Sequence, residues 1–258
     1  MLRNTAMHGE RFGALEDVIR RLLGDDGCPW DRAQTPESMR AFVIEEAFEV
    51  VEAIDIGDHV ALREELGDLL MQVVFIGELA RAQDWFTTDD VIEGIRAKLV
   101  RRHPHVFGDA TVGDADEVLL QWERIKRAEK KGRGLLEGVP AAMPALLRAV
   151  AISEKAARVG FDWPDVAGVR DKVGEELAEL DAATTRDEQE HELGDLLFAL
   201  ASWARKSDLD PEAALRSALR RFGGRMQHVE AGAAEDGLAL EDMDAVELDR
   251  RWERAKRD

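Results

Sequence analysis

The sequence predicts an all-α protein made of two related helical-bundle domains in tandem. Apolar residues recur at helical spacing along nearly the whole chain, and no stretch shows the sustained alternation that a half-buried strand needs. Proline, which interrupts helices, accounts for only 7 of the 258 residues. Similar segments also return about 130 residues apart, which is typical of a duplicated domain.

Ten helices are expected in order along the chain, five in each half. In the first half, the helix that ends in RRH stops at Pro104, because proline cannot continue a helical hydrogen-bond ladder. In the second half, Thr185 and Glu188 have the spacing of a capping box, and Asp210 before Pro211 fits an N-cap. The apolar periodicity places the helices at 10–23, 37–56, 59–83, 89–102, 116–131, 143–158, 166–183, 186–206, 211–231 and 243–257.

Three pairs of segments define the duplication. IEEAFEVVEAI at 44–54 resembles GEELAELDAAT at 174–184, ELGDLL occurs at 65–70 and 192–197, and QWERIKR at 121–127 resembles RWERAKR at 251–257. Between the two sets lies EKKGRGLLEGVP at 129–140, which is rich in glycine and lysine. We therefore expect one helical domain over 1–130 and a second over 131–258.

The composition excludes several classes of function. The net charge of -19, from 54 acidic and 35 basic residues, is the opposite of what non-specific nucleic-acid or anionic-membrane binders usually carry. An anionic substrate would need a local basic pocket or a bridging cation. Cys28 is the sole cysteine, so no internal disulfide can form. The longest apolar stretch, at 69–80, is too short to span a bilayer, and we expect a cytoplasmic protein.

Acidic residues form the clearest chemical pattern of the first half. A short loop should make the two helices that carry them antiparallel neighbours, so that the two acidic sets face one another. No lysine or arginine occurs between Arg40 and Arg63, and the run LLMQVVFI after Asp68 suggests that this part of the helix is enclosed. The acids are Glu45, Glu46, Glu49 and Glu52 on one helix and Glu65 and Asp68 on the next.

Clustered carboxylates suit a hard divalent cation such as Mg²⁺ or Mn²⁺ better than they suit Zn²⁺. The alternative is an ordinary solvated acidic face, and it is stronger in the second half because Lys172 can pair with Glu176. Gly67 and Gly194 could permit close helix approach or leave room for a ligand. The second half repeats the acids as Glu175, Glu176, Glu179, Glu192 and Asp195, and Leu69, Leu70, Leu196 and Leu197 are expected to anchor both ELGDLL copies in the core.

Basic and aromatic residues gather near the ends of both halves. Cations at a helix end can simply complement the helix dipole, or they can clamp phosphates, since arginine donates bidentately to phosphate oxygens. Tryptophans are mostly core residues, but they can also stack on a base. The positions are Lys98, Arg101, Arg102, Trp122 and Lys126 in the first half and Arg221, Arg225, Trp252 and Lys256 in the second.

The combination of EExxE, ExxD, a basic helix and a late Trp-Lys pair resembles the MazG nucleoside triphosphate pyrophosphohydrolases of the all-α NTP pyrophosphatase superfamily. The resemblance covers nearly the whole chain and includes GCPWDRAQT at 27–35, RRHPHVFGD at 101–109 and KAARVGFDWPDV at 155–166. It implies a two-domain all-α fold that converts a nucleoside triphosphate to the monophosphate and pyrophosphate with Mg²⁺. The implied role is house-cleaning or control of the nucleotide pool.

The resemblance also implies roles for individual residues. Gly224 stands where the family carries an arginine. Apart from the resemblance, the twin acidic sets suggest the hypothesis that Glu45 or Glu175 takes the proton of the attacking water. The implied metal ligands are Glu46, Glu49, Glu65 and Asp68 in the first half and Glu176, Glu179, Glu192 and Asp195 in the second. The implied phosphate contacts are Lys98, Arg101, Arg102, Arg221 and Arg225, and Trp122 and Trp252 would contact the nucleotide with Lys126 and Lys256 nearby.

Alternatives stay open on function and assembly. The acids could be vestigial in a helical scaffold or regulatory binding protein, or the substrates could be deoxynucleotides or damaged nucleotides. Related folds complete their bundles by dimerising, so the resemblance implies a homodimer.

Overall fold

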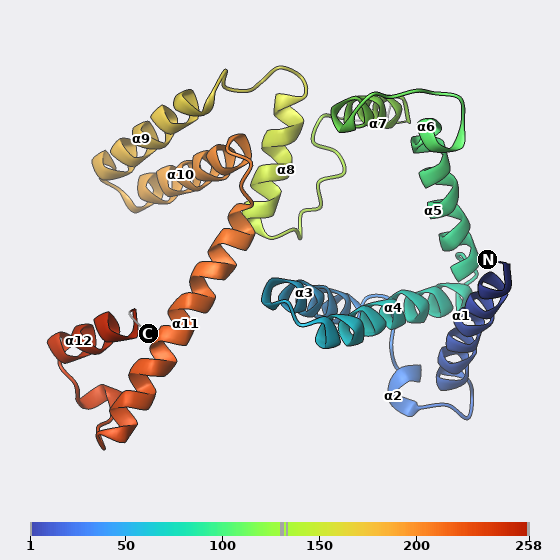
Figure 1. Cartoon of the computed structure of the whole chain (residues 1–258), viewed down its shortest axis with the longest axis horizontal. Helices are drawn as coiled ribbons and strands as arrows, with labels where there is room; N and C mark the ends of the chain where they lie inside the picture. The colour runs from blue at the N-terminus through green and yellow to red at the C-terminus, as the bar shows by residue number, and fades with distance from the viewer. Residues whose placement is uncertain (1, 130–131, 133, 257–258) are drawn as a thin grey trace. The chain divides into compact units, whose positions relative to one another are not determined.

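The computed structural model describes residues 2–129, 132 and 134–256, and every regular element in these ranges is helical (Figure 1). The expected all-α class is therefore confirmed. The chain divides into two compact units, Met1–Lys131 and Gly132–Asp258. Among the described helices, none is long and apolar enough to cross a bilayer.

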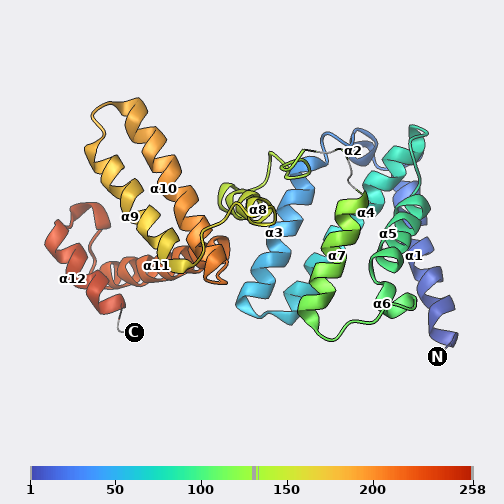
Figure 2. The same cartoon turned by 90° about the horizontal axis from the view of Figure 1, so that it is seen from above.

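The first unit is organised around a helical hairpin of α3 and α4, on which α1 packs and from which α5 departs (Figures 1 and 2). The hairpin turns at Gly57, whose φ of 75° lies in the left-handed region that favours glycine. Asp58 then caps α4 by accepting from the amides of Val60 and Ala61. The helices are α1 (Leu2–Leu23), α2 (Pro29–Arg32), α3 (Arg40–Ile56), α4 (His59–Ala82), α5 (Thr88–Arg102), α6 (Pro104–Phe107) and α7 (Ala115–Glu129).

The core of the first unit lies where α1 crosses α4. Glu78 of α4 is buried at this crossing and is held by two arginines, with Arg20 Nη2 2.9 Å from its Oε1 and Arg81 Nε 2.7 Å from its Oε2. These ion pairs satisfy a carboxylate that burial alone would penalise. The buried apolar residues of the core are Ile19, Met39, Val74, Phe75 and Leu79.

The second unit repeats the hairpin as α9 and α10, with α8 packed on α10 and α12 packed on the long helix α11 (Figure 1). Thr185 and Glu188 form the expected capping box at the start of α10, and Asp210 caps α11 ahead of Pro211. The elements are α8 (Ala145–Ala157), α9 (Val166–Ala182), α10 (Arg186–Lys206), α11 (Pro211–Glu235), the 3₁₀ turn η1 (Leu240–Asp242) and α12 (Ala245–Ala255).

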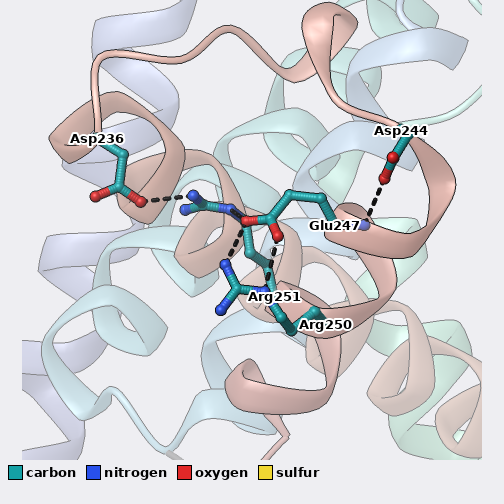
Figure 3. A network of polar contacts seen from close by, with 5 residues as sticks. All are labelled: Asp236, Asp244, Glu247, Arg250 and Arg251. Carbon is teal, nitrogen blue, oxygen red and sulfur yellow. Dashed lines mark hydrogen bonds and ion pairs between the residues drawn. The ribbon is translucent and has the colours of Figure 1, made fainter.

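An ion-pair network fixes α12 on the end of α11 (Figure 3). Arg251 is buried, and its guanidinium pairs with Asp236 at 2.5 Å and with Glu247 at 2.7 Å. Arg250 donates to the same carboxylate, and this bond together with those of Arg251 outweighs desolvation and lowers the pKa of Glu247 to about 2. Asp244 caps the helix by accepting from the Glu247 amide. The network holds the helix that carries the following residue, Trp252.

The observed helices correspond in order to the ten that the sequence predicts, with differences at their ends. α11 continues to Glu235, four residues past the expected end, and α1 begins at Leu2 rather than at residue 10. The short helices α2 and α6 were not predicted. Pro104 ends α5 as expected, but it also opens α6 at the first helical position, where a missing amide proton costs nothing. The expected ends at 131 and 257 lie outside the described residues.

The predicted enclosure of the two ELGDLL segments is wrong for a single chain. Leu69 and Leu196 are half-buried, but Leu70 is 42% exposed and Leu197 is 47% exposed. Asp68 is exposed as well. Leu70 and Leu197 are therefore open to solvent in the single chain. The apolar run after Asp68 therefore has two sides, one buried in the core and one open.

Candidate functional site

The first hairpin brings three carboxylates together. Oxygen atoms of Glu46 and Glu49 on α3 and of Glu65 on α4 all lie within 4.8 Å of one another. The spacing of three residues puts the first two on one helix face. The tight turn between α3 and α4 makes the helices neighbours, so that Glu65 comes opposite that face. We call Glu46, Glu49 and Glu65 the first acidic cluster.

Among the residues that the structure describes, no cation forms an ion pair with the first acidic cluster. Burial raises the pKa of Glu46, a hydrogen bond from Gln72 lowers it, and the charges of Asp68 and Glu49 raise it again, with a net upward shift. Burial and the charges of Asp68 and Glu46 likewise raise the pKa of Glu65. Gln72 Nε2 donates to Glu46 Oε1 over 3.2 Å. Carboxylates crowded in this way gain stability from a bound cation.

The remaining acids of the first half lie around this cluster. Asp68 influences the pKa of both Glu46 and Glu65, but it is not part of the close group of three. Glu45 and Glu52 are exposed on α3. The structure therefore brings together three of the four predicted ligands and leaves Asp68 at the edge of the group.

The second hairpin builds the equivalent group from Glu176 and Glu179 on α9 and Glu192 on α10, again within 4.8 Å. We call these three residues the second acidic cluster. Burial and the charges of Glu176 and Glu192 raise the pKa of Glu179. The fourth predicted ligand, Asp195, is exposed and lies 3.3 Å from the ring of His191.

A lysine distinguishes the second acidic cluster from the first. Lys172 Nζ lies 2.6 Å from Glu176 Oε1 and 2.8 Å from Glu175 Oε1. Hydrogen bonds to both carboxylates raise the pKa of Lys172 above its ordinary value. The pairing that the sequence allowed between Lys172 and Glu176 is thus present.

Both acidic clusters fit a hard divalent cation. Each offers three carboxylate groups whose oxygens are close enough to share one ion. All the donors are oxygen, which Mg²⁺ and Mn²⁺ prefer. Burial first, and then repulsion between neighbouring carboxylates, raises the pKa values of Glu46, Glu65 and Glu179, and a bound cation would relieve the repulsion.

A basic and aromatic group lies on α5 and α7 of the first unit. The guanidinium carbon of Arg102 lies 5.7 Å from the centroid of the Trp122 ring, and Lys126 Nζ lies 5.0 Å from it. Glu129 joins the group, because Arg101 Nε donates to one of its oxygens over 2.7 Å and Arg102 Nη2 to the other over 2.6 Å. These bonds outweigh desolvation and lower the pKa of Glu129 to about 2. Lys98 is half-buried one turn earlier on α5.

The second unit carries a matching group on α11 and α12. Arg225 lies 5.8 Å and Lys256 6.0 Å from the centroid of the Trp252 ring. Phe222 packs on the same tryptophan, with ring centroids 4.9 Å apart. Arg221 lies one turn earlier, and its Nη1 donates to Ser217.

Three residues near these groups were missed in the sequence. Gln72 is the one polar residue in the apolar run LLMQVVFI. Glu129 opens the glycine- and lysine-rich segment EKKGRGLLEGVP, far in sequence from the arginines that it contacts. Phe222 adjoins Arg221 in sequence. Each contact joins helices that are separate in sequence, so periodicity within a helix does not reveal it.

The two ELGDLL glycines are not required by close helix packing within the chain. A Cβ added at Gly67 or Gly194 would meet no atom of the described structure within 4 Å. Of the two explanations left open by the sequence, close approach between helices of the same chain is therefore excluded for the described residues.

Comparison with known proteins agrees with this arrangement. Residues 34–107 match the sequence model of the MazG nucleotide pyrophosphohydrolase domain, and residues 154–222 match that of phosphoribosyl-ATP pyrophosphohydrolase. The nucleoside triphosphate pyrophosphohydrolase/pyrophosphatase MazG of Thermotoga maritima is 44% identical over 96% of this chain and 96% of its own length. The nucleoside triphosphate pyrophosphohydrolase of Escherichia coli K12 is 40% identical over 93% of this chain and 95% of its own. The Bacillus subtilis protein YabN is 44% identical over 95% of this chain and 51% of its own.

Proposed function

The chain belongs to the MazG nucleoside triphosphate pyrophosphohydrolase family, and from this premise we propose that it hydrolyses nucleoside triphosphates, deoxynucleotides included, to the monophosphate and pyrophosphate with Mg²⁺. The observation that supports this most strongly is the presence of two equivalent acidic clusters on two equivalent hairpins. The physiological role that fits such a reaction is house-cleaning or control of the nucleotide pool.

The metal would be held by the two acidic clusters together with Asp68 and Asp195. When bound, Mg²⁺ neutralises charge on the triphosphate and on the departing pyrophosphate and makes a bound water more acidic. Mn²⁺ offers the same coordination chemistry with oxygen donors. The crowding of Glu46, Glu49 and Glu65, with no described cation paired to them, supports this assignment in the first half.

The remaining chemistry falls to the protein side chains. Water attacks the α-phosphorus, and the bond from that phosphorus to the α–β bridging oxygen breaks, so that pyrophosphate leaves. Glu45 or Glu175 takes the proton of the attacking water. Glu175 Oε1 already accepts a hydrogen bond from Lys172, which orients its carboxylate. No covalent intermediate on the protein is needed.

The nucleotide would be bound by the basic and aromatic groups. In each unit the indole of Trp122 or Trp252 can stack on the base. Arginine guanidinium groups, such as Arg102 and Arg225, suit phosphate oxygens because they donate through two N–H groups at once. Further positive charge on the otherwise acidic chain comes from the same helices, at Lys98, Arg101, Lys126 and Arg221, and from Lys256 at the C-cap of α12.

The active assembly would be a homodimer formed through the open faces of the hairpins. Leu66, Leu70 and Val73 follow one another at spacings of four and three residues on α4, and each is 42% or more exposed. On α10 the equivalent residues Leu193, Leu197 and Leu200 are also exposed. An apolar stripe repeated on both hairpins fits a second copy of the chain, which would complete a helical bundle.

The proposed reaction is tested by identifying its products. The protein is incubated with each nucleoside triphosphate and deoxynucleotide in the presence of Mg²⁺, and the products are separated by anion exchange. Monophosphate and pyrophosphate in equal amounts are expected, with no turnover after chelation of the metal. Diphosphate and phosphate would contradict the proposal. A helical scaffold with vestigial acids would give no turnover and no thermal shift with Mg²⁺.

A further inference from the structure

The two acidic clusters have matching carboxylates but different neighbours. Gln72 follows the first ELGDLL at the place that Ala199 takes after the second. Lys172 stands four residues before Glu176, at the place that Phe42 takes before Glu46. Each cluster therefore has one polar neighbour that the other lacks, and in both cases this neighbour contacts the equivalent glutamate.

In the first acidic cluster the neighbour is neutral. Gln72 is only 3% exposed, and its Nε2 donates to Glu46 Oε1 over 3.2 Å. Its own Oε1 is buried with no hydrogen-bond partner among the described atoms. A neutral donor orients the Glu46 carboxylate without offsetting its charge. Phe42, at the place of the lysine, packs on the core and on Trp30.

In the second acidic cluster the neighbour is a cation. The Lys172 ammonium lies 2.6 Å from Glu176, a side chain that is itself 6% exposed, and 2.8 Å from Glu175. Ala199, at the place of the glutamine, is buried and offers no donor. A divalent ion entering this cluster must share Glu176 with the ammonium and is also repelled by it.

We propose that Gln72 and Lys172 are positioning residues that give the two metal sites different affinities, so that without nucleotide the first acidic cluster binds a divalent cation more tightly than the second. Gln72 orients Glu46 without adding a positive charge beside it, whereas the Lys172 ammonium competes with a metal ion for Glu176. The two hairpins are thus unequal metal sites. The first binds a divalent cation before nucleotide is present, and the second binds it only at a higher metal concentration. This inference rests on the proposed function, because it concerns the same metal sites.

The test uses the full chain with one acidic cluster disabled at a time. The double variant Glu179→Gln/Glu192→Gln disables the second acidic cluster and keeps the first intact. The double variant Glu49→Gln/Glu65→Gln disables the first and keeps the second intact. Mn²⁺ is titrated into each protein, and the free ion is measured by electron paramagnetic resonance. The first cluster should bind Mn²⁺ about tenfold more tightly, the lower end of what outer-shell partners contribute to metal affinity.

Substitutions of the positioning residues then separate charge from packing. In the protein that keeps the second cluster, Lys172→Met should tighten Mn²⁺ binding about tenfold, whereas Lys172→Arg should leave it weak because the charge remains. In the protein that keeps the first cluster, Gln72→Ala should weaken binding, and Gln72→Asn reports whether a shorter amide can replace it. The reverse change at Phe42 is avoided, since that side chain packs on the core. Circular dichroism melts identify any variant that fails to fold, and Lys172→Gln then replaces Lys172→Met.

The possible outcomes are distinct. If neither cluster binds Mn²⁺, the proposed metal sites and with them the inference are wrong. If both bind with equal affinity, the metal sites stand and the inference is overturned. It is also overturned if Lys172→Arg tightens binding as much as Lys172→Met, because the effect would then come from packing and not from charge.

Discussion

The guanidinium carbon of Arg225 lies 5.8 Å from the centroid of the Trp252 ring, a geometry that Arg102 and Trp122 repeat at 5.7 Å in the first unit. In each case the two residues come from helices that are separate in sequence, α11 and α12 or α5 and α7. A cation beside an aromatic face forms a platform on which a nucleotide base and its phosphates can both be bound.

Removing the indole of Trp252 should weaken nucleotide binding. Stacking of a base on an aromatic side chain is worth ~1–3 kcal/mol, so Trp252→Ala should raise the Kd of a non-hydrolysable α,β-methylene nucleotide at this unit about tenfold. Isothermal titration calorimetry measures the change. Trp85→Ala is the matched control, because Trp85 is 56% exposed and belongs to neither basic group. Equal losses in both variants would contradict a nucleotide contact by Trp252.

Removing the carboxylate of Glu129 should strengthen nucleotide binding at the first unit. Glu129 occupies Arg101 and Arg102 with hydrogen bonds of 2.7 and 2.6 Å, and its pKa of about 2 keeps it ionised at neutral pH. Glu129→Gln frees both guanidinium groups for phosphate oxygens, so the Kd for a triphosphate should fall several-fold and the salt dependence of binding should increase. The control is Glu93→Gln, which removes an exposed ion pair with Arg96 on α5, the helix that carries Arg101 and Arg102. Weaker binding in Glu129→Gln would instead mean that Glu129 holds the arginines in place.

A charged residue in the apolar stripe of each hairpin should abolish the proposed dimer. Leu70→Asp together with Leu197→Asp places two carboxylates on faces that would be buried between copies, and an unpaired buried charge is strongly unfavourable. Sedimentation equilibrium should give twice the chain mass for the native protein and the chain mass for the variant. Val60→Asp is the control, since Val60 is 62% exposed on α4 but lies off the stripe. A variant that remains dimeric would place the interface elsewhere.

The buried Glu78 should make stability depend on pH. Burial alone would raise the pKa of Glu78, but the hydrogen bonds and charges of Arg20 and Arg81 outweigh it, so the pKa is lowered on folding from its ordinary value of 4.5. The ionised form therefore stabilises the folded chain above pH 4.5, and this contribution is lost as the pH falls through the folded pKa. Glu78→Gln should cost ~1–3 kcal/mol at pH 7 and progressively less below pH ~4.

Urea unfolding at pH 7 and at pH ~3 measures both effects of Glu78→Gln. Glu190→Gln, which removes an exposed pair with Arg186, should change stability little at either pH. A constant difference between native protein and Glu78→Gln over this range would show that the ion pairs to Arg20 and Arg81 are not its source.

The parts of the fold that depend on local sequence were predictable. Thr185 and Glu188 lie three residues apart, which is enough to place the start of α10. The antiparallel pairing of α3 with α4 followed from the short loop, and the meeting of Glu46 with Glu65 followed from that pairing. Such features are set within one helix or one turn, and periodicity together with capping chemistry describes them well.

The features that escaped prediction depend on which helix packs against which. The exposure of Leu70 and Leu197 could not be read from an apolar run, because the run does not say how many of its sides are covered. The bonds of Gln72 to Glu46 and of Glu129 to Arg101 join side chains that are far apart in sequence. The pair of Lys172 and Glu176 is predictable from the sequence because the two residues lie one turn apart on the same helix.

The two acidic clusters are the proposed sites of hydrolysis, and single and double removal of their α4 and α10 members tests this most directly. Pyrophosphate release from a nucleoside triphosphate with Mg²⁺ is measured for the native protein, Glu65→Ala, Glu192→Ala and the double variant. Each single variant should retain the activity of the other half, and the double variant should lose about 100-fold or more, since ligand loss exceeds what outer-shell changes cost. Native turnover in the folded double variant would contradict the account.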